Sequence, residues 1–129
     1  MESDFLVVDD STAIRKILQR VLRQTGMPIG QVHEAANGKE ALLLLETTSV
    51  DLILSDINMP EMDGLQLLAS LKASARWRHI PVIMITTEGS ATKVADAGRL
   101  GAAGYVRKPF SADQIKEKLA SFFEPTELL

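Results

Sequence analysis

The stretch Phe5-Leu6-Val7-Val8-Asp9-Asp10-Ser11 joins four consecutive apolar residues to two acidic residues and a residue that can cap a helix. Its apolar part does not alternate with polar residues, which is typical of a strand buried on both faces. Similar runs occupy residues 52–54 and 82–85. More polar runs at 31–35 and 104–106 are typical of edge strands. The sequence therefore predicts five strands.

Segments with helical spacing of apolar residues separate these strands. A Ser or Asn can cap a helix by accepting from its first free backbone N–H groups, and a Gly commonly ends one. The expected helix markers are Ser11 and Gly26 for the first helix, residues 64–73 for the third and Ser90 for the start of the fourth. Asn37 with Glu40 and Ser111 with Gln114 resemble capping boxes, in which the two side chains bond reciprocally to the backbone, at the starts of the second and last helices. Five strand–helix units in strict alternation predict an α/β fold, a parallel sheet covered by helices on both faces.

Composition narrows the class of protein. A length of 129 residues predicts one domain, spanning residues 1–129. The net charge of -3 argues against binding to nucleic acid, which needs a basic face. The chain contains no cysteine, so disulfides and thiolate metal sites are excluded. No apolar run approaches the ~18 residues of a membrane span, and the first residues lack the basic start of a signal peptide. We expect a cytoplasmic protein that does not bind membranes.

Acidic residues follow two of the predicted strands. Ligands of open α/β sheets bind beyond the carboxyl ends of the strands. Asp9 and Asp10 follow the first strand, and Asp56 follows the third. If these strands are neighbours, three carboxylates converge, and two unit charges ~5 Å apart repel by about 3 kcal/mol at an effective dielectric of ~20. Either some of these groups are protonated or a cation lies among them. Oxygen ligands without His or Cys favour Mg²⁺ or Mn²⁺.

The remaining strand ends add residues suited to phosphoryl chemistry. The fourth strand ends in Thr86, and the fifth runs into Lys108-Pro109. A divalent ion and a lysine let an acidic pocket hold a phosphoryl group, and a carboxylate can itself become an aspartyl-phosphate. Thr86 can donate a hydrogen bond to a phosphoryl oxygen. Walker, dinucleotide and Gly-x-Ser-x-Gly motifs are all lacking in the sequence.

Several segments in this order resemble the signatures of response-regulator receiver domains. These segments are Val7-Val8-Asp9-Asp10-Ser11, Ser55-Asp56-Ile57-Asn58-Met59-Pro60, Met62-Asp63-Gly64, Thr86-Thr87-Glu88 and residues 101–110. The resemblance covers residues 5 to about 123 and goes with a flavodoxin-like sheet of strand order 2-1-3-4-5.

The resemblance assigns a role to each matching residue. Asp56 is the expected phosphoacceptor from a histidine kinase or phosphotransfer domain. The metal ligands it implies are Asp9 or Asp10, Asp56 and the backbone carbonyl of Asn58. Phosphoryl oxygens would contact Thr86 and Lys108, and the bond Lys108–Pro109 is commonly cis in this family.

The resemblance also implies an output. Thr86 and Tyr105 would relay a switch to a partner on the face of the fourth helix, fifth strand and fifth helix. Asn58 and Glu88 are similar to residues of fast-cycling, single-domain chemotaxis regulators, so we expect a short-lived phosphorylated form and a monomer. Ile57 and Arg107 depart from that subgroup, in which a tryptophan and an apolar residue are usual.

Three other functions compete with this interpretation. A haloacid-dehalogenase-type phosphatase would need an acid at position 58, and the amide of Asn58 cannot carry its proton. A flavodoxin-like cofactor module would place a flavin phosphate against an acidic loop. A pseudo-receiver would lack an acid or the lysine, and all of them are present.

Overall fold

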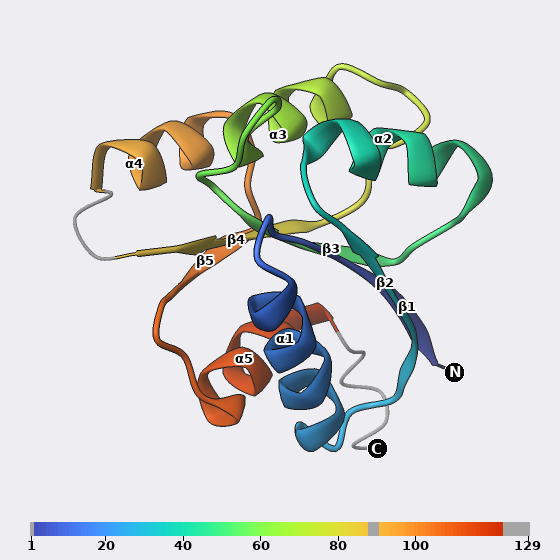
Figure 1. Ribbon diagram of the computed structural model, residues 1–129, viewed down its shortest axis with the longest axis vertical. Helices are drawn as coiled ribbons and strands as arrows, with labels where there is room; N and C mark the ends of the chain where they lie inside the picture. Colours follow the sequence, from blue (N-terminus) through green and yellow to red (C-terminus); the bar gives the residue numbers. More distant parts are fainter. Residues whose placement is uncertain (1, 88–90, 123–129) are drawn as a thin grey trace.

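A computed structural model describes residues 2–87 and 91–122, in which strands and helices alternate as the sequence predicts (Figure 1). The elements are β1 (Ser3–Val8), α1 (Thr12–Gln24), β2 (Ile29–Ala35), α2 (Gly38–Thr47), β3 (Leu52–Asp56), α3 (Gly64–Lys72), β4 (Val82–Thr86), α4 (Ala91–Arg99), β5 (Gly104–Arg107), α5 (Ala112–Leu119) and a short 3-10 turn, η1 (Ala120–Phe122). The expected start of the fourth helix at Ser90 lies outside the described residues.

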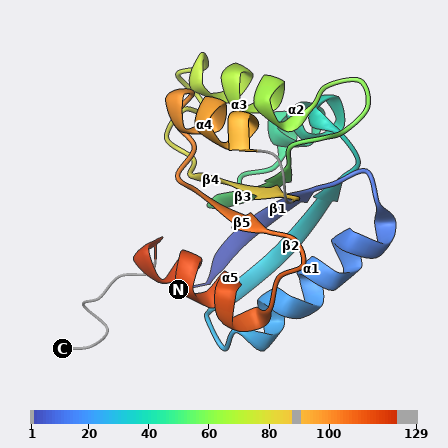
Figure 2. The same ribbon diagram turned by 90° about the vertical axis from the view of Figure 1, so that its left-hand side faces the viewer.

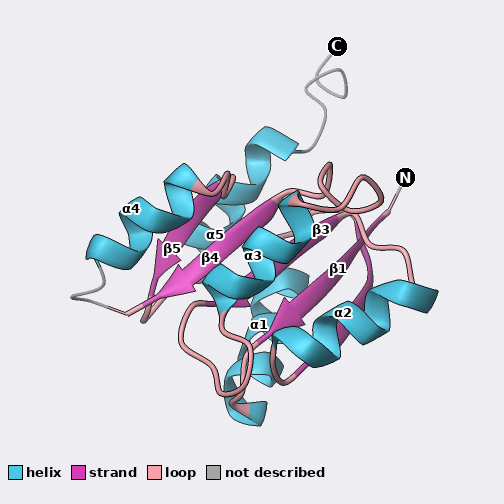
Figure 3. Ribbon diagram, turned by 90° about the horizontal axis from the view of Figure 1, so that it is seen from above, coloured by secondary structure: helices cyan, strands magenta, loops and turns pink. Residues whose placement is uncertain are grey.

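The strands form one parallel sheet in the order β2-β1-β3-β4-β5, which confirms the predicted fold class. Figure 3 shows the arrows of the sheet pointing the same way. In the register of the sheet, Val8 pairs with Ser55 and Thr86 pairs with Arg107. The residues that follow these pairs therefore leave the sheet at one edge, where β1 and β3 end side by side.

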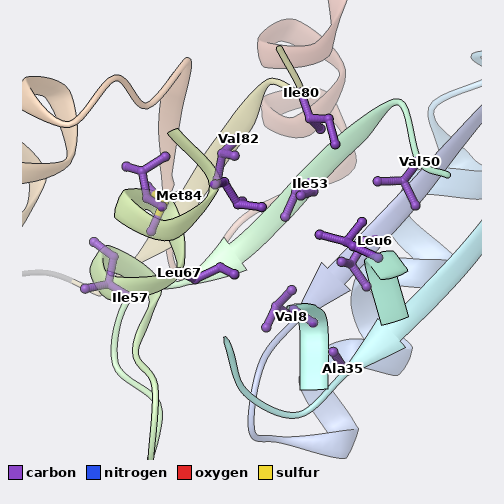
Figure 4. Packing of buried hydrophobic residues seen from close by; sticks show 14 of the residues in the cluster. Leu6, Val8, Ala35, Val50, Ile53, Ile57, Leu67, Ile80, Val82 and Met84 are labelled. Carbon is purple, nitrogen blue, oxygen red and sulfur yellow. The ribbon is translucent and has the colours of Figure 1, made fainter. Parts of the chain in front are cut away.

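Alternate residues of the central strands point to opposite faces of the sheet and build two separate apolar cores. Leu6, Ile53 and Met84 belong to the core beneath α2, α3 and α4, part of which is seen in Figure 4. The neighbouring residues Leu54 and Ile85 belong to the core against α1 and α5. Figures 1 and 2 show the sheet between these two layers. Burial on both faces explains why the central strands read as continuous apolar runs.

Helix caps fix where several elements begin. Ser11 accepts from the Ile14 N–H, and Ser111 with Gln114 forms the predicted reciprocal capping box. Asn37 caps α2, but the Glu40 carboxylate accepts from the Ala36 N–H and not from residue 37. The reciprocal box expected there is therefore wrong, because the extended backbone before α2 offers the preceding amide instead.

Helix α3 has a capping box that the sequence interpretation missed. The Asp63 carboxylate accepts from the Gln66 N–H at 2.9 Å, and the Gln66 side chain accepts from the Asp63 N–H at 3.0 Å. This box sets the start of α3 at Gly64, directly behind the end of β3. It thereby fixes one end of the loop that follows Asp56.

Candidate functional site

The structure brings Asp9, Asp10 and Asp56 together at the carboxyl edge of the sheet. One carboxylate oxygen from each lies within 4.8 Å of the others. Asp9 is 1% exposed and Asp56 is 7% exposed, whereas Asp10 is exposed to solvent. The acidic cluster, by which we mean these three residues, thus has two buried members and one that opens to water.

Lys108 supplies a positive charge inside the acidic cluster. Its Nζ lies 3.1 Å from Asp9 Oδ2 and 3.5 Å from Asp56 Oδ2. The backbone N–H of Lys108 donates to the Thr86 carbonyl at 2.6 Å, which extends the pairing of β4 and β5 by one residue. The bond Lys108–Pro109 is cis, as the resemblance implied. A residue 52 positions away from Asp56 in the sequence therefore becomes its ion-pair partner.

The surroundings of Asp56 raise its pKa above the ordinary value. Burial is the largest cause, and the negative charge of Asp9 adds to it. The Lys108 charge and a backbone hydrogen bond from Ile57 oppose the shift without cancelling it. Among the described residues, the three carboxylates outnumber the Lys108 ammonium that pairs with two of them, and this excess of negative charge favours a bound cation.

Thr86 and Tyr105 lie on neighbouring strands but in different surroundings. The Thr86 side chain is buried, and its hydroxyl donates to the Thr87 carbonyl at 3.2 Å. Tyr105 is 44% exposed, and the Lys118 ammonium lies 5.5 Å from the centre of its ring. The structure thus places Thr86 at the carboxyl edge and Tyr105 on the outer surface of β5.

Asn58 lies in the loop between β3 and α3, two residues beyond Asp56, and is exposed. The ammonium of Lys93, on α4, donates a hydrogen bond to Asn58 Oδ1. The second residue expected to tune dephosphorylation, Glu88, lies outside the described residues. The sequence interpretation missed Lys93, because only the fold brings α4 to this loop.

The backbone behind Asp56 is packed too closely for any side chain at residue 64. The Gly64 N–H donates to the Ile57 carbonyl at 2.8 Å. A Cβ added to Gly64 would lie 2.2 Å from the Asp56 carbonyl oxygen and 2.9 Å from the Ile57 Cα. Glycine is therefore required for this close approach, which holds the loop after Asp56 against α3.

Arg15 is a second residue that the sequence interpretation missed. Its guanidinium donates to the backbone carbonyl of Asp9 at 2.6 Å and to Glu34 Oε1 at 2.9 Å. Burial raises the pKa of Glu34, but hydrogen bonds and charges from Arg15 and Lys16 outweigh it and leave this pKa below its ordinary value. The arginine thereby ties the loop after β1 to the edge strand β2. Arg15 is one of three arginines in the amphipathic helix α1, and its position in the sequence gives no signal of such a contact.

Comparisons with known proteins agree with this geometry. Residues 5–120 match the family model described as the response regulator receiver domain. The chain is 39% identical over 119 residues to the chemotaxis protein CheY of Pseudomonas aeruginosa, covering 92% of this chain and 94% of that protein. It is also 39% identical to the chemotaxis protein CheY-3 of Vibrio cholerae, covering 92% of this chain and 90% of that protein.

Solved structures of similar proteins have the same fold. The chemotaxis response regulator CheY4 of Vibrio cholerae superimposes with a TM-score of 0.83 at 32% identity, covering 95% of this chain and all of that one. A response regulator receiver domain protein from Clostridium thermocellum gives a TM-score of 0.82 at 26% identity, covering 98% of each chain. In the part of this chain that the structure describes, no helix is both long and apolar enough to cross a membrane.

Proposed function

The chain belongs to the response regulator receiver domain family of two-component signalling, and we propose that it is a chemotaxis-type regulator switched by phosphorylation of Asp56. The observation that carries the proposal is the meeting of three carboxylates with Lys108 at the carboxyl edge of the sheet. The identity to CheY proteins over most of the chain supports the chemotaxis-type output.

The acidic cluster fits a divalent ion. Its donors are all oxygens, its buried members repel each other, and the pKa of Asp56 is raised. We propose that Asp9, Asp10, Asp56 and the backbone carbonyl of Asn58 hold Mg²⁺, with Mn²⁺ as a substitute. When bound, the ion supplies positive charge that offsets the phosphoryl oxygens.

Asp56 is the proposed nucleophile in the transfer of the phosphoryl group. Its carboxylate oxygen attacks phosphorus of a phosphohistidine on a kinase or phosphotransfer domain. The phosphorus–oxygen bond forms as the phosphorus–nitrogen bond breaks, and the bond electrons remain on the histidine nitrogen. Lys108, already 3.5 Å from Asp56, balances the added negative charge, and the Thr86 hydroxyl turns from the Thr87 carbonyl to a phosphoryl oxygen.

The output is proposed to pass through the face formed by α4, β5 and α5. If Thr86 moves towards the phosphoryl group, it leaves space beside β5 that Tyr105 can fill from its exposed position. One new anion would then bias an element with two positions, which is the form that phosphorylation switches take. The output protein would bind this face of a monomer. A cytoplasmic location stays a prediction.

The competing functions differ from this proposal in measurable ways. A haloacid-dehalogenase-type phosphatase would turn over phosphate esters, but residue 58 is an asparagine and its amide cannot serve as a general acid. A pseudo-receiver would not be phosphorylated at all. The family match and the complete set of acids, threonine and lysine favour the receiver over both.

Phosphorylation by a small donor tests the proposal directly. With acetyl phosphate and Mg²⁺, intact-mass spectrometry should show one added phosphoryl group, and EDTA should prevent its addition. The Asp56→Asn variant should gain none, and p-nitrophenyl phosphate should not be turned over. An unchanged mass gain in Asp56→Asn would remove Asp56 as the acceptor. Steady turnover of the ester would support the phosphatase instead.

A further inference from the structure

Two segments that are far apart in the sequence meet beside the acidic cluster. Lys93 is the third residue of α4 and is partly buried, and its ammonium is hydrogen-bonded to Asn58 Oδ1. Asn58 is exposed in the loop that follows Asp56. The contact therefore places a positively charged side chain at the solvent side of the phosphoacceptor.

This second ammonium matters because of the charge balance at the edge of the sheet. The acidic cluster contains three carboxylates, and Lys108 is the ammonium that ion-pairs with its two buried members. Phosphorylation replaces the single negative charge of Asp56 with a phosphoryl group of about two negative charges. The Lys93 ammonium, held by Asn58 two residues beyond the acceptor in the chain, is attracted by this added negative charge.

Hydrolysis of the aspartyl-phosphate depends on access from the same side. The oxygen of a water molecule attacks phosphorus in line with the bond to Asp56. The phosphorus–oxygen bond then breaks, and Asp56 is released as a carboxylate. The products are inorganic phosphate and a proton that passes to solvent. Asp56 is only 7% exposed, so attacking water has limited access to it, and the loop that directly follows Asp56 carries the exposed Asn58.

We propose that Lys93, held by Asn58, shields the phosphoryl group on Asp56 from hydrolytic water and prolongs the phosphorylated state. The inference rests on the proposed function of Asp56. It opposes the short lifetime expected from Asn58 and Glu88, because a small residue at position 58 leaves a path for water that the lysine from α4 fills. Lys93 is a positioning residue here: it acts on the access of water and does not take part in bond making.

The lifetime of the phosphorylated protein tests this role. Wild type, Lys93→Gln, Lys93→Arg and Arg99→Gln are phosphorylated with acetyl phosphate and Mg²⁺, the donor is removed, and the decay of the phosphoryl mass is followed. Lys93→Gln should decay about fivefold faster, the size expected from losing one partly exposed charge-assisted hydrogen bond. Lys93→Arg should stay within about twofold of wild type. Arg99→Gln removes a charge from the last residue of the same helix and should decay like wild type.

A double substitution shows whether Lys93 acts from its contact with Asn58. In an Asn58→Ala background the lysine has no amide oxygen to hold it, so Lys93→Gln should accelerate decay by less than twofold. In the wild-type background, loss of the contact should also shift the NMR signals of the Asn58 side-chain amide in Lys93→Gln but not in Arg99→Gln. A full fivefold effect in the Asn58→Ala background would contradict the proposed positioning.

Titration of the unphosphorylated protein with Mg²⁺ gives a measurement that does not involve hydrolysis. Removal of a positive charge near the acidic cluster should make Mg²⁺ bind about two- to threefold tighter in Lys93→Gln, and Arg99→Gln should leave the affinity unchanged. If Lys93→Gln is phosphorylated normally and decays at the wild-type rate, the inference about Lys93 is overturned while the proposed function stands. If Asp56 is not phosphorylated at all, the proposed function itself fails.

Discussion

Strands β1 and β3 have aspartates at both of their ends, and the two ends use them differently. Asp4 and Asp51 lie at the amino edge of the sheet, Asp4 within β1 and Asp51 just before β3. Asp9 and Asp56 lie at the carboxyl edge, with Asp10 beside them. The same residue type therefore lies in different surroundings at the two edges, and its role can be compared between them.

The amino-edge aspartates serve the backbone. Asp51 Oδ2 accepts from the Asp4 N–H at 2.7 Å, and Asp4 Oδ1 accepts from the Gln31 N–H at 2.8 Å. Asp51 is exposed and Asp4 is only partly buried. Their carboxylates accept from backbone N–H groups and are open to solvent. These side chains therefore join β1 to β2 and β3 without burying negative charge.

The carboxyl-edge aspartates are buried against one another. Asp9 and Asp56 share the ammonium of Lys108, and the pKa of Asp56 is raised by burial and by Asp9. Burial of like charges costs free energy unless a cation joins them. An acid at a strand end is therefore not enough to indicate the candidate functional site. What distinguishes the site is that its aspartates are buried together.

The largest contrast should appear in phosphorylation of the two ends of β3. Asp56→Asn should lower the rate of phosphoryl uptake from acetyl phosphate by at least ~100-fold, because the amide is not a nucleophile. Asp51→Asn, just before the same strand, should keep the wild-type rate, as measured by intact mass over time. A similar loss in Asp51→Asn would mean that the two edges are not independent.

Glycines at the two edges should differ in the free energy of unfolding. Gly64→Ala forces a Cβ to within 2.2 Å of the Asp56 backbone carbonyl and should destabilise the fold by roughly 2–3 kcal/mol. At the amino edge, the Cβ of Gly30→Ala would meet Asp4 Oδ1 at 2.4 Å.

The Asp4 side chain can turn away from that Cβ, so Gly30→Ala should cost less than ~1 kcal/mol, the value of one net hydrogen bond. Urea denaturation measures both variants. Equal losses would show that the backbone behind Asp56 is no more rigid than that of the edge strand β2.

Aspartate substitutions at the two edges should differ in their effect on Mg²⁺ affinity by about one order of magnitude. Asp10→Asn removes a charge from the acidic cluster and should weaken Mg²⁺ binding about tenfold. Asp4→Asn retains a side-chain oxygen that can accept from the Gln31 N–H and should leave the Mg²⁺ affinity unchanged. Calorimetric or fluorescence titration checks both, and equal affinity in Asp10→Asn would remove Asp10 from the site.

The smallest expected effect is a dependence of folding stability on pH that comes from Asp56 at the carboxyl edge. Because the pKa of Asp56 is raised in the folded state, the folded chain binds more protons than the unfolded chain between the ordinary and the raised value. Stability is therefore lost as pH rises through this window, and the penalty is fully present above it. Asp56→Asn removes the penalty and should be more stable than wild type at pH 7 without Mg²⁺.

The advantage of Asp56→Asn should shrink as pH falls through this window and disappear below the ordinary carboxyl pKa, where Asp56 is protonated in both the folded and the unfolded wild type. Thermal denaturation in EDTA measures it, and each ~1 kcal/mol corresponds to a few degrees in a domain of this size. Asp51→Asn should show no such gain. A less stable Asp56→Asn at pH 7 would contradict the assigned cause of the pKa shift.

Local patterns in the sequence were enough for the elements and for the residues of the acidic cluster. Continuous apolar runs indicated the buried strands, and Ser11 and Ser111 indicated two helix starts, because capping and strand burial depend on neighbours along the chain. Acids directly after strands predicted where Asp9, Asp10 and Asp56 would lie, once β1 and β3 proved to be adjacent. The roles of the individual residues came from the family resemblance and stay predictions.

Contacts between distant segments were decided only by the tertiary structure. Lys93 reaches Asn58 across 35 positions and Arg15 reaches Glu34 across 19. The close approach of Gly64 to the Asp56 carbonyl likewise depends on how α3 packs behind β3. A long polar side chain can reach many different partners, and the sequence does not indicate which one. Its partner is determined by how the helices and strands pack. The difference between the amino and carboxyl edges has the same origin. The sequence does not distinguish one aspartate from another, and only folding determines whether its carboxylate lies beside backbone amides and solvent or beside other buried charges.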